Sequence, residues 1–194
     1  MKVSRSGSIA ALMGLVFLMA GCGSSTPAAG SHHKAKAATG AKKKPAASTK
    51  SSGASGPFVT SQDPSAKTVN LSVTAGATID NFYYNFNGFD QGNATITVPV
   101  GWTVKVDISN ESGSANSVVI APSISNLTPA FTGAASPDVT AGIQAGESQT
   151  FQFVAQTAGS YVLACGVPGQ ASQDGMWVKF VVSASATRAS SQKS

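Results

Sequence analysis

Between about residue 66 and residue 183, short stretches of alternating polar and apolar residues are separated by Gly, Asn and Pro. A period of two residues is typical of a strand with one buried and one exposed face. No stretch keeps a 3.6-residue apolar repeat over three helical turns, so a helical core is not expected. The pattern predicts an all-β sandwich or barrel. We expect seven or eight strands, chosen from residues 68–73, 82–89, 94–98, 102–108, 118–120, 148–154, 161–164 and 176–182.

Two segments lack this alternation. Residues 122–142 are poor in large apolar residues and long for a connection, so we expect an excursion there with room for one short helical turn. The tail at 185–194 is mostly Ser and Ala, and we expect it to be disordered. The folded domain is therefore placed at 63–184, and about 120 residues suffice for one hydrophobic core.

The first 22 residues have the parts of a secretory signal. Lys2 and Arg5 precede an apolar run at 9–18, which is shorter than the roughly 20 residues that span a bilayer. The small residues before Cys22 resemble the lipobox of bacterial lipoproteins. That resemblance implies a signal peptide at 1–21 and a lipidated Cys22 that anchors an extracytoplasmic protein to the bacterial membrane. The alternative is an ordinary signal peptide with a chance cysteine.

A polar, basic segment follows at 22–62, and we expect it to be a disordered tether because it has too few large apolar residues to form a core. It contains six lysines, and no acid precedes Asp63. Such a tether can contact anionic lipid or wall polymer, although a solvated spacer without a partner is the alternative. His32 and His33 form a pair that could bind metal weakly or simply belong to the spacer.

The charge of the whole chain conceals an asymmetry. The formal net charge is +5, but residues 61–184 hold three lysines and eight acidic residues, a net charge of −5. The folded part is acidic, and we therefore expect no nucleic-acid binding. The chain has two cysteines, and lipidation of Cys22 leaves Cys165 without a partner for an intrachain disulfide.

Several motifs of the β region resemble the cupredoxin family. The stretch Thr-Val-Pro-Val-Gly-Trp-Thr-Val at 97–104 resembles the family's VPxGxxV segment. Phe-Gln-Phe at 151–153 and Ala-Gly-Ser-Tyr at 158–161 resemble the approach to its copper loop. Cys-Gly-Val-Pro-Gly-Gln at 165–170, followed by Gly-Met-Trp at 175–177, is most similar to the sulfocyanin-like branch. The resemblance covers about residues 80–183.

This resemblance implies a Greek-key β-sandwich and single-electron transfer by a type 1 copper. The family's copper lies between two histidine imidazoles and a cysteine thiolate, with a weak axial methionine. The positions that match these ligands are Asn116, Cys165, Gln170 and Met176. The two sulfur residues are thus kept, and amides stand in place of both imidazoles. Five residues separate Gln170 from Met176, one more than in the usual loop.

Amide oxygens are hard, neutral donors and poor substitutes for imidazole nitrogen. We therefore predict no ordinary blue-copper centre and expect no cofactor from the residues themselves, although the resemblance implies copper. Cu(I) could still bind the sulfur atoms of Cys165 and Met176. In the alternative, these two residues are simply buried, while Asn116 and Gln170 hydrogen-bond each other or nearby backbone and join two loops in place of a metal.

Three functions remain open. The first is a non-redox binding or accessory module whose protein partner the sequence does not identify. The second is a copper protein, either a Cu(I) carrier or an electron-transfer protein, that uses Cys165 and Met176. The third is thiol redox chemistry at Cys165. An enzyme is not expected, because the domain has no histidine and no Ser-His-Asp set. Tyr161 is expected to bond backbone at a strand corner, and Trp102 and Trp177 to lie in the core.

Overall fold

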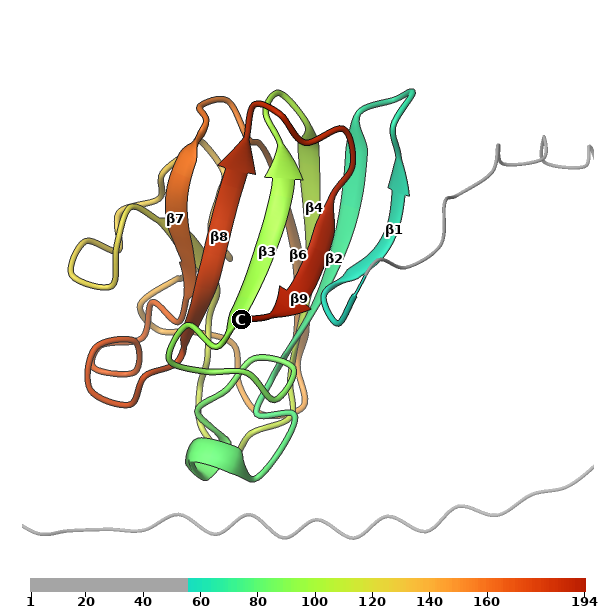
Figure 1. Ribbon diagram of the computed structural model, residues 1–194. Helices are drawn as coiled ribbons and strands as arrows, with labels where there is room; N and C mark the ends of the chain where they lie inside the picture. Colours follow the sequence, from blue (N-terminus) through green and yellow to red (C-terminus); the bar gives the residue numbers. More distant parts are fainter. Residues whose placement is uncertain (1–55) are drawn as a thin grey trace, which may run out of the picture. The chain divides into compact units, whose positions relative to one another are not determined.

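The computed structural model describes residues 56–194, and the predicted signal peptide, Cys22, His32, His33 and most of the tether lie outside these described residues. The described part is built from strands and one short 3-10 turn, η1 (Asp80–Tyr83) (Figure 1). The strands are β1 (Val59–Asp63), β2 (Thr68–Ala75), β3 (Ala94–Pro99), β4 (Thr103–Asn110), β5 (Val119–Ala121), β6 (Ser148–Val154), β7 (Gly159–Ala164), β8 (Trp177–Ser183) and β9 (Ser190–Lys193).

The strands form two sheets, as expected for a sandwich. One sheet has the order β1-β2-β4-β6, and the other has the order β5-β7-β8-β3-β9. The pairs β2–β4 and β3–β8 are parallel, and the remaining pairs are antiparallel. Figure 1 shows β3, β7, β8 and β9 in one layer and β2, β4 and β6 in the layer behind it. The predicted all-β, cupredoxin-like sandwich is confirmed.

The alternation in the sequence becomes burial on one face of each strand. In β2, every second side chain from Val69 to Ala75 is fully buried. β4 repeats this pattern with Val104, Val106 and Ile108. The inward faces of the two sheets form one hydrophobic core, in which Phe153 of β6 and Phe180 of β8 pack with ring centroids 6.1 Å apart. One-sided burial thus explains why the strands could be located from periodicity.

The VPxGxxV-like segment connects the two sheets. β3 pairs with β8 and β9, whereas β4 pairs with β2 and β6, so the turn at 99–102 carries the chain from one layer to the other. Gly101 has a left-handed φ of 79°, which suits glycine at this turn. Trp102 follows it and is only 5% exposed, which confirms its predicted place in the core.

The predicted ends of the domain were wrong at both termini. Phe58 and Val59 are fully buried, so the folded part begins before residue 63. At the other end, the segment predicted as a disordered tail forms β9, which pairs with β3. The Ser191 hydroxyl accepts the Phe58 N–H at 2.9 Å, and the Gln62 side chain bonds both the N–H and the carbonyl of Ala189. The C-terminal segment is held in place by backbone pairing and polar hydrogen bonds, which cannot be recognised from its composition.

Two connections also differ from expectation. The aromatic stretch at 82–89 is not a strand but part of η1 and the loop after it. The excursion at 122–142 contains bridges and turns but no helical turn within this described stretch, and its Phe131 stacks on Phe153 at 5.7 Å. Tyr161 donates its hydroxyl to the Thr157 carbonyl at 3.1 Å, so the predicted corner tyrosine is confirmed. Among residues 56–194, no helix has the length and apolar character needed to cross a membrane.

Candidate functional site

The four residues identified by the cupredoxin resemblance come from three neighbouring segments at one end of the sandwich. β5 pairs antiparallel with β7, so the residues just before β5, including Asn116, lie beside Cys165 at the end of β7. β7 also pairs antiparallel with β8, and this pairing places Met176 beside Cys165. The Cys165 N–H donates to the Met176 carbonyl at 3.0 Å. Strand register alone therefore brings these segments together.

Cys165 is completely buried, and its thiol has a defined hydrogen-bond partner. The thiol donates to Gln170 Oε1 at 2.9 Å, while the Ser117 N–H donates to Cys165 Sγ at 3.3 Å. The Asn116 Oδ1 atom lies farther away, 4.0 Å from the sulfur. The sulfur is thus surrounded by two amide oxygens and by the N–H and hydroxyl groups of Ser117, and the thiol donates to the nearer amide oxygen, that of Gln170.

Gln170 completes a link between two loops. Its Nε2 donates to the Ala115 carbonyl at 3.0 Å, so its side chain joins the thiol of Cys165 to the segment before β5. The Gln170 carbonyl also accepts the Met176 N–H at 2.9 Å. We call the chain of bonds from Cys165 through Gln170 to Ala115 the amide clasp. It matches the alternative in which amides bond nearby backbone, whereas a direct bond between Asn116 and Gln170 is not part of it.

The Asn116 amide oxygen faces the sulfur, while its amide nitrogen belongs to a second polar network. Its amide nitrogen donates to Asn110 Oδ1 at 3.0 Å, to the Ser114 carbonyl at 3.0 Å and to the Ser112 hydroxyl. Asn110 in turn donates to the Ile143 carbonyl at 2.9 Å. These contacts fix the orientation of the Asn116 amide. Asn110 and Ser112 were missed in the sequence, where the run Asn-Glu-Ser-Gly-Ser at 110–114 was the available turn signal.

The electrostatics favour a neutral thiol. Burial raises the pKa of the Cys165 thiol, and the opposing hydrogen bonds from Ser117 do not offset that effect. A raised pKa keeps the proton on sulfur at neutral pH, in agreement with its role as a donor to Gln170. Reactive cysteines are partly exposed and have lowered pKa values, so Cys165 has the properties of a structural cysteine.

Close packing leaves little freedom in the loop that follows Cys165. The Ser117 hydroxyl accepts the Gly166 N–H at 2.9 Å and donates to the Val139 carbonyl at 2.6 Å. A Cβ atom at Gly166 would lie 2.4 Å from Val139 Cγ2 and 2.9 Å from the Val139 carbonyl oxygen. The excursion at 122–142 therefore packs directly on the cysteine loop, and residue 166 must be glycine for this packing.

A type 1 copper does not fit these residues. Such a site needs two imidazole nitrogens beside the cysteine sulfur, whereas the side chains at the two matching positions here are amides. Among residues 56–194, no three or more His, Cys, Asp or Glu side chains form a group that could hold a metal ion. Within the same residues, the one buried side-chain polar atom without a partner is Gln149 Oε1, on β6 rather than in this site. No orphaned donor atom marks a metal position.

A cavity beside the loop between Cys165 and Met176 lies outside the clasp. It has a volume of about 360 Å³ and is lined mainly by residues 171–173 and 175, together with Gln91, Ile124 and Trp177. Cys165 does not line it. Trp177 is partly buried and packs against a small buried cluster of Val119, Ala121, Ala164 and Ala171, so it lies at the edge of the core. Gly92 packs against its ring, because a Cβ there would lie 2.5 Å from Trp177 Cη2.

Comparison with known proteins defines the family. Residues 55–190 match the Sulfocyanin (SoxE) domain, which places this chain among the cupredoxins. The chain belongs to the sulfocyanin domain family. It is 29% identical to the sulfocyanin of Sulfolobus acidocaldarius over 139 residues, and the match covers 62% of this chain and 66% of that protein. The match therefore spans slightly less than two thirds of the relative's length.

Solved structures show similarity in fold at low identity. Reduced auracyanin from Roseiflexus castenholzii is 20% identical, with a TM-score of 0.41, over 59% of this chain and 96% of that chain. Auracyanin A from Chloroflexus aurantiacus is 21% identical, with a TM-score of 0.43, over 60% of this chain and 99% of that chain. A multicopper oxidase from Campylobacter jejuni is 18% identical, with a TM-score of 0.47, over 69% of this chain and 30% of that chain.

Proposed function

We propose that this protein is a lipid-anchored, extracytoplasmic member of the sulfocyanin family that has lost the copper site and works as a non-redox binding or accessory module. Lipid on Cys22 holds it at the bacterial membrane, and the basic tether lies between the anchor and the folded domain. In this proposal Asn116 and Gln170 stand where relatives of this fold have their histidine ligands. The protein has no catalytic role of its own.

The observation that supports loss of copper is the amide clasp. The Cys165 thiol donates its proton to Gln170 Oε1 at 2.9 Å and is fully buried. Binding of Cu(II) by this thiol would displace that proton and break the bond to Gln170. The amides beside the sulfur offer no imidazole nitrogen to complete a copper site in return. The same burial argues against thiol redox chemistry at Cys165.

The test is to load the purified domain of residues 56–194 with Cu(II) and record its visible spectrum. We expect a colourless protein with less than about one tenth of an equivalent of copper retained after dialysis. The matched control is the double variant Asn116→His/Gln170→His, which restores two imidazoles beside Cys165 and Met176. It should develop an intense thiolate-to-copper band, and Cys165→Ser in that background should remove the band. A strong blue band in the unmodified protein would contradict the proposal.

A copper function through Cys165 and Met176 is the second candidate. The two residues are adjacent in the structure, since the Cys165 N–H bonds the Met176 carbonyl at 3.0 Å, and both sulfur types are soft donors that suit Cu(I). Competition with a Cu(I) chelator distinguishes the candidates. A Cu(I) carrier should hold copper at least about tenfold more tightly than its Cys165→Ser variant, whereas equal affinities would remove this candidate.

A further inference from the structure

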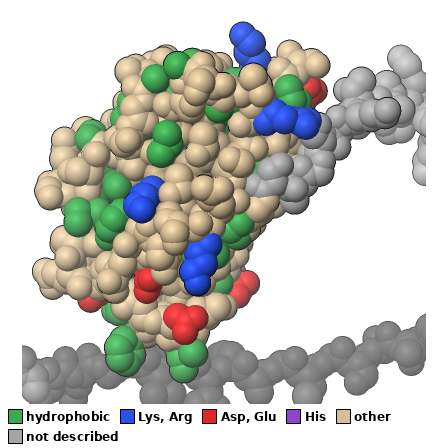
Figure 2. Space-filling model, viewed as in Figure 1, with side chains coloured by type: hydrophobic (Ala, Val, Ile, Leu, Met, Phe, Trp, Pro, Cys, Tyr) green, Lys and Arg blue, Asp and Glu red, His purple; other side chains and the backbone are tan. Residues whose placement is uncertain are grey.

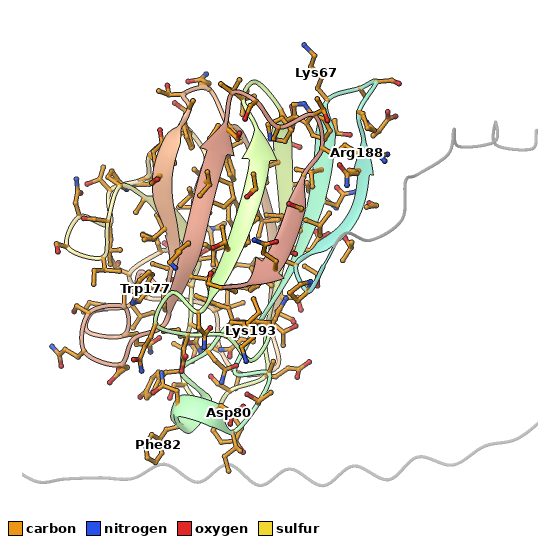
Figure 3. All side chains as sticks on the ribbon, in the orientation of Figure 1. Lys67, Asp80, Phe82, Trp177, Arg188 and Lys193 are labelled. Carbon is orange, nitrogen blue, oxygen red and sulfur yellow. The ribbon has the colours of Figure 1, made fainter. Side chains whose placement is uncertain are left out.

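The turn η1 exposes apolar side chains at the end of the sandwich where the clasp lies. Ile79 is 72% exposed, Phe82 86% and Tyr83 45%. We call these three residues the apolar tip. Figure 3 shows Phe82 directed away from the strands, at the far end of the turn. Large apolar side chains that cluster on a surface mark sites of interaction.

The backbone of this turn is strained. Asn81, Phe82 and Tyr83 have consecutive left-handed φ angles of 49°, 53° and 69°. This conformation is unfavourable for residues with a Cβ atom, and it is uncommon even for single non-glycine residues. Strain of this kind persists only where surrounding contacts impose it, and such residues cluster at functional sites.

Two buried or partly buried asparagines impose the conformation. Asn85, which is fully buried, donates to the carbonyls of Thr78 and Asp80, both at 2.8 Å. Asn81 donates to the Tyr84 carbonyl at 2.9 Å and to the Asp174 carbonyl at 2.6 Å. The second bond ties the turn to the loop between Cys165 and Met176. The polar groups are thus used to fix the turn, while its apolar side chains are left to solvent.

The surroundings of the tip are acidic. The β2–β3 and β4–β5 loops, residues 138–147 and the β7–β8 loop meet at this end of the sandwich, and none of them contains Lys, Arg or His. They contain six acidic residues, namely Asp80, Asp90, Glu111, Asp138, Glu147 and Asp174. Lys193 also lies at this end, because it pairs with Ala94 beside the β2–β3 loop, whereas Lys67 and Arg188 lie at the opposite end (Figure 3). The acidic residues outnumber it. Figure 2 shows acidic side chains beside the protruding apolar ones.

We infer that the apolar tip is the docking surface for a protein partner whose own surface offers an apolar pocket bordered by Lys or Arg. The inference rests on the proposed binding role and names the surface that performs it. Phe82 enters the pocket, and Asp80 and Asp174 face the basic border. An acidic surface is repelled by anionic lipid and attracted by a basic protein, so charge complementarity selects the protein over the bilayer. The fixed turn limits the ordering that docking would otherwise require.

The test is photo-crosslinking in the native membrane. The full-length lipoprotein carries p-benzoylphenylalanine at position 82, and the matched control carries it at Val154, which is 40% exposed at the opposite end of β6. We expect one discrete protein adduct from position 82 and none from position 154. The peptide joined to position 82 should contain Lys or Arg beside apolar residues. The yield should fall at least about fivefold in Asp80→Asn/Asp174→Asn and on raising the salt from about 0.05 to about 0.5 M.

Several outcomes would overturn this inference. They are the absence of an adduct at position 82, adducts with lipid or a second copy of this chain alone, and a protein adduct that responds neither to salt nor to the charge variants. A discrete adduct from a crosslinker at Gln173, beside the cavity, with none at position 82, would overturn the docking surface but leave the binding role. A blue copper band in the unmodified protein would instead contradict the proposed function, without removing the adduct at position 82. Failure of the docking surface and failure of the proposed function are therefore distinguishable.

Discussion

The amide clasp and the apolar tip lie at the same end of the sandwich and use asparagine and glutamine in opposite ways. In the clasp, Gln170 satisfies a buried thiol and a backbone carbonyl, so no group is left for a ligand. In the tip, Asn81 and Asn85 satisfy the backbone and hold a strained turn open, so that Phe82 is left exposed. One set of amides closes a site, and the other presents a surface.

This difference shows where the capacity to bind lies in the molecule. A buried group with complete hydrogen bonding gains nothing from a ligand unless it first loses those bonds. An exposed apolar side chain on a fixed backbone loses only water when it is covered. A change in the clasp should therefore destabilise the fold, whereas a change in the tip should leave stability nearly intact and alter binding. The free energies of unfolding of clasp and tip variants measure the two sides of this contrast.

The largest effect is expected from Gly166→Ala. The new Cβ would meet Val139 Cγ2 at 2.4 Å and the Val139 carbonyl oxygen at 2.9 Å, and the backbone oxygen has little room to move. Overpacking of this kind should lower the free energy of unfolding by about 3 kcal/mol, measured by urea denaturation. Gly113→Ala is the control, because a Cβ there meets nothing within 4 Å. Equal stabilities for the two variants would show that the cysteine loop is not tightly packed.

The next effect is expected from Gln170→Ala. It leaves the Cys165 thiol and the Ala115 carbonyl without their partner in a buried place, which should destabilise the domain by about 2 kcal/mol. The control is Gln173→Ala, three residues along the same loop, where the side chain is exposed and the change should stay within about 0.5 kcal/mol. If both variants unfold at the same urea concentration, the clasp does not stabilise the fold.

The strands could be predicted because burial on one face leaves a period of two in the sequence. β6 was placed at the observed residues, and β2, β4, β7 and β8 within two residues at each end. The sequence motifs identified which residues belong to the candidate site, but they did not give the contacts among those residues. Which amide bonds the thiol depends on side-chain orientation across two loops. Asn116 and Gln170 are equivalent in the sequence but not in the structure, where only Gln170 contacts the sulfur closely.

β9 and η1 were missed for different physical reasons. β9 has no apolar alternation, and it is held by its ladder with β3 and by contacts with residues 58–62 that are more than 120 positions away in the chain. η1 lies in a stretch of aromatic residues that favours a strand by local propensity. Side chains of Asn81 and Asn85 override that propensity by bonding backbone carbonyls. Long-range pairing and local side-chain bonds are both invisible to a pattern of hydrophobicity.

A smaller effect, of opposite sign, is expected from Phe82→Gly. Glycine adopts the left-handed φ of 53° at this position without a steric penalty, and the lost side chain is 86% exposed. The variant should unfold at slightly higher urea concentration, with a gain of about 0.5–1 kcal/mol offset in part by the greater freedom of the unfolded chain. Val154→Gly is the control, since it removes an exposed apolar side chain from a strand and should destabilise. A clear loss of stability in Phe82→Gly would show that the tip is part of the fold rather than a surface.

The smallest effect concerns pH and appears only in alkaline solution. The pKa of the Cys165 thiol is raised from its ordinary value of 9.0, chiefly by burial. The folded protein therefore keeps a proton that the unfolded chain loses, and this contribution to stability is complete below pH 9.0 and is lost as the pH rises through the folded pKa. The free energy of unfolding, measured between pH 7 and pH 11, should fall more steeply for the unmodified domain than for Cys165→Ala. The difference between the two curves removes the contributions of lysine and tyrosine, which both proteins share. Parallel curves would mean that the thiol ionises equally in both states and that the clasp does not hold its proton.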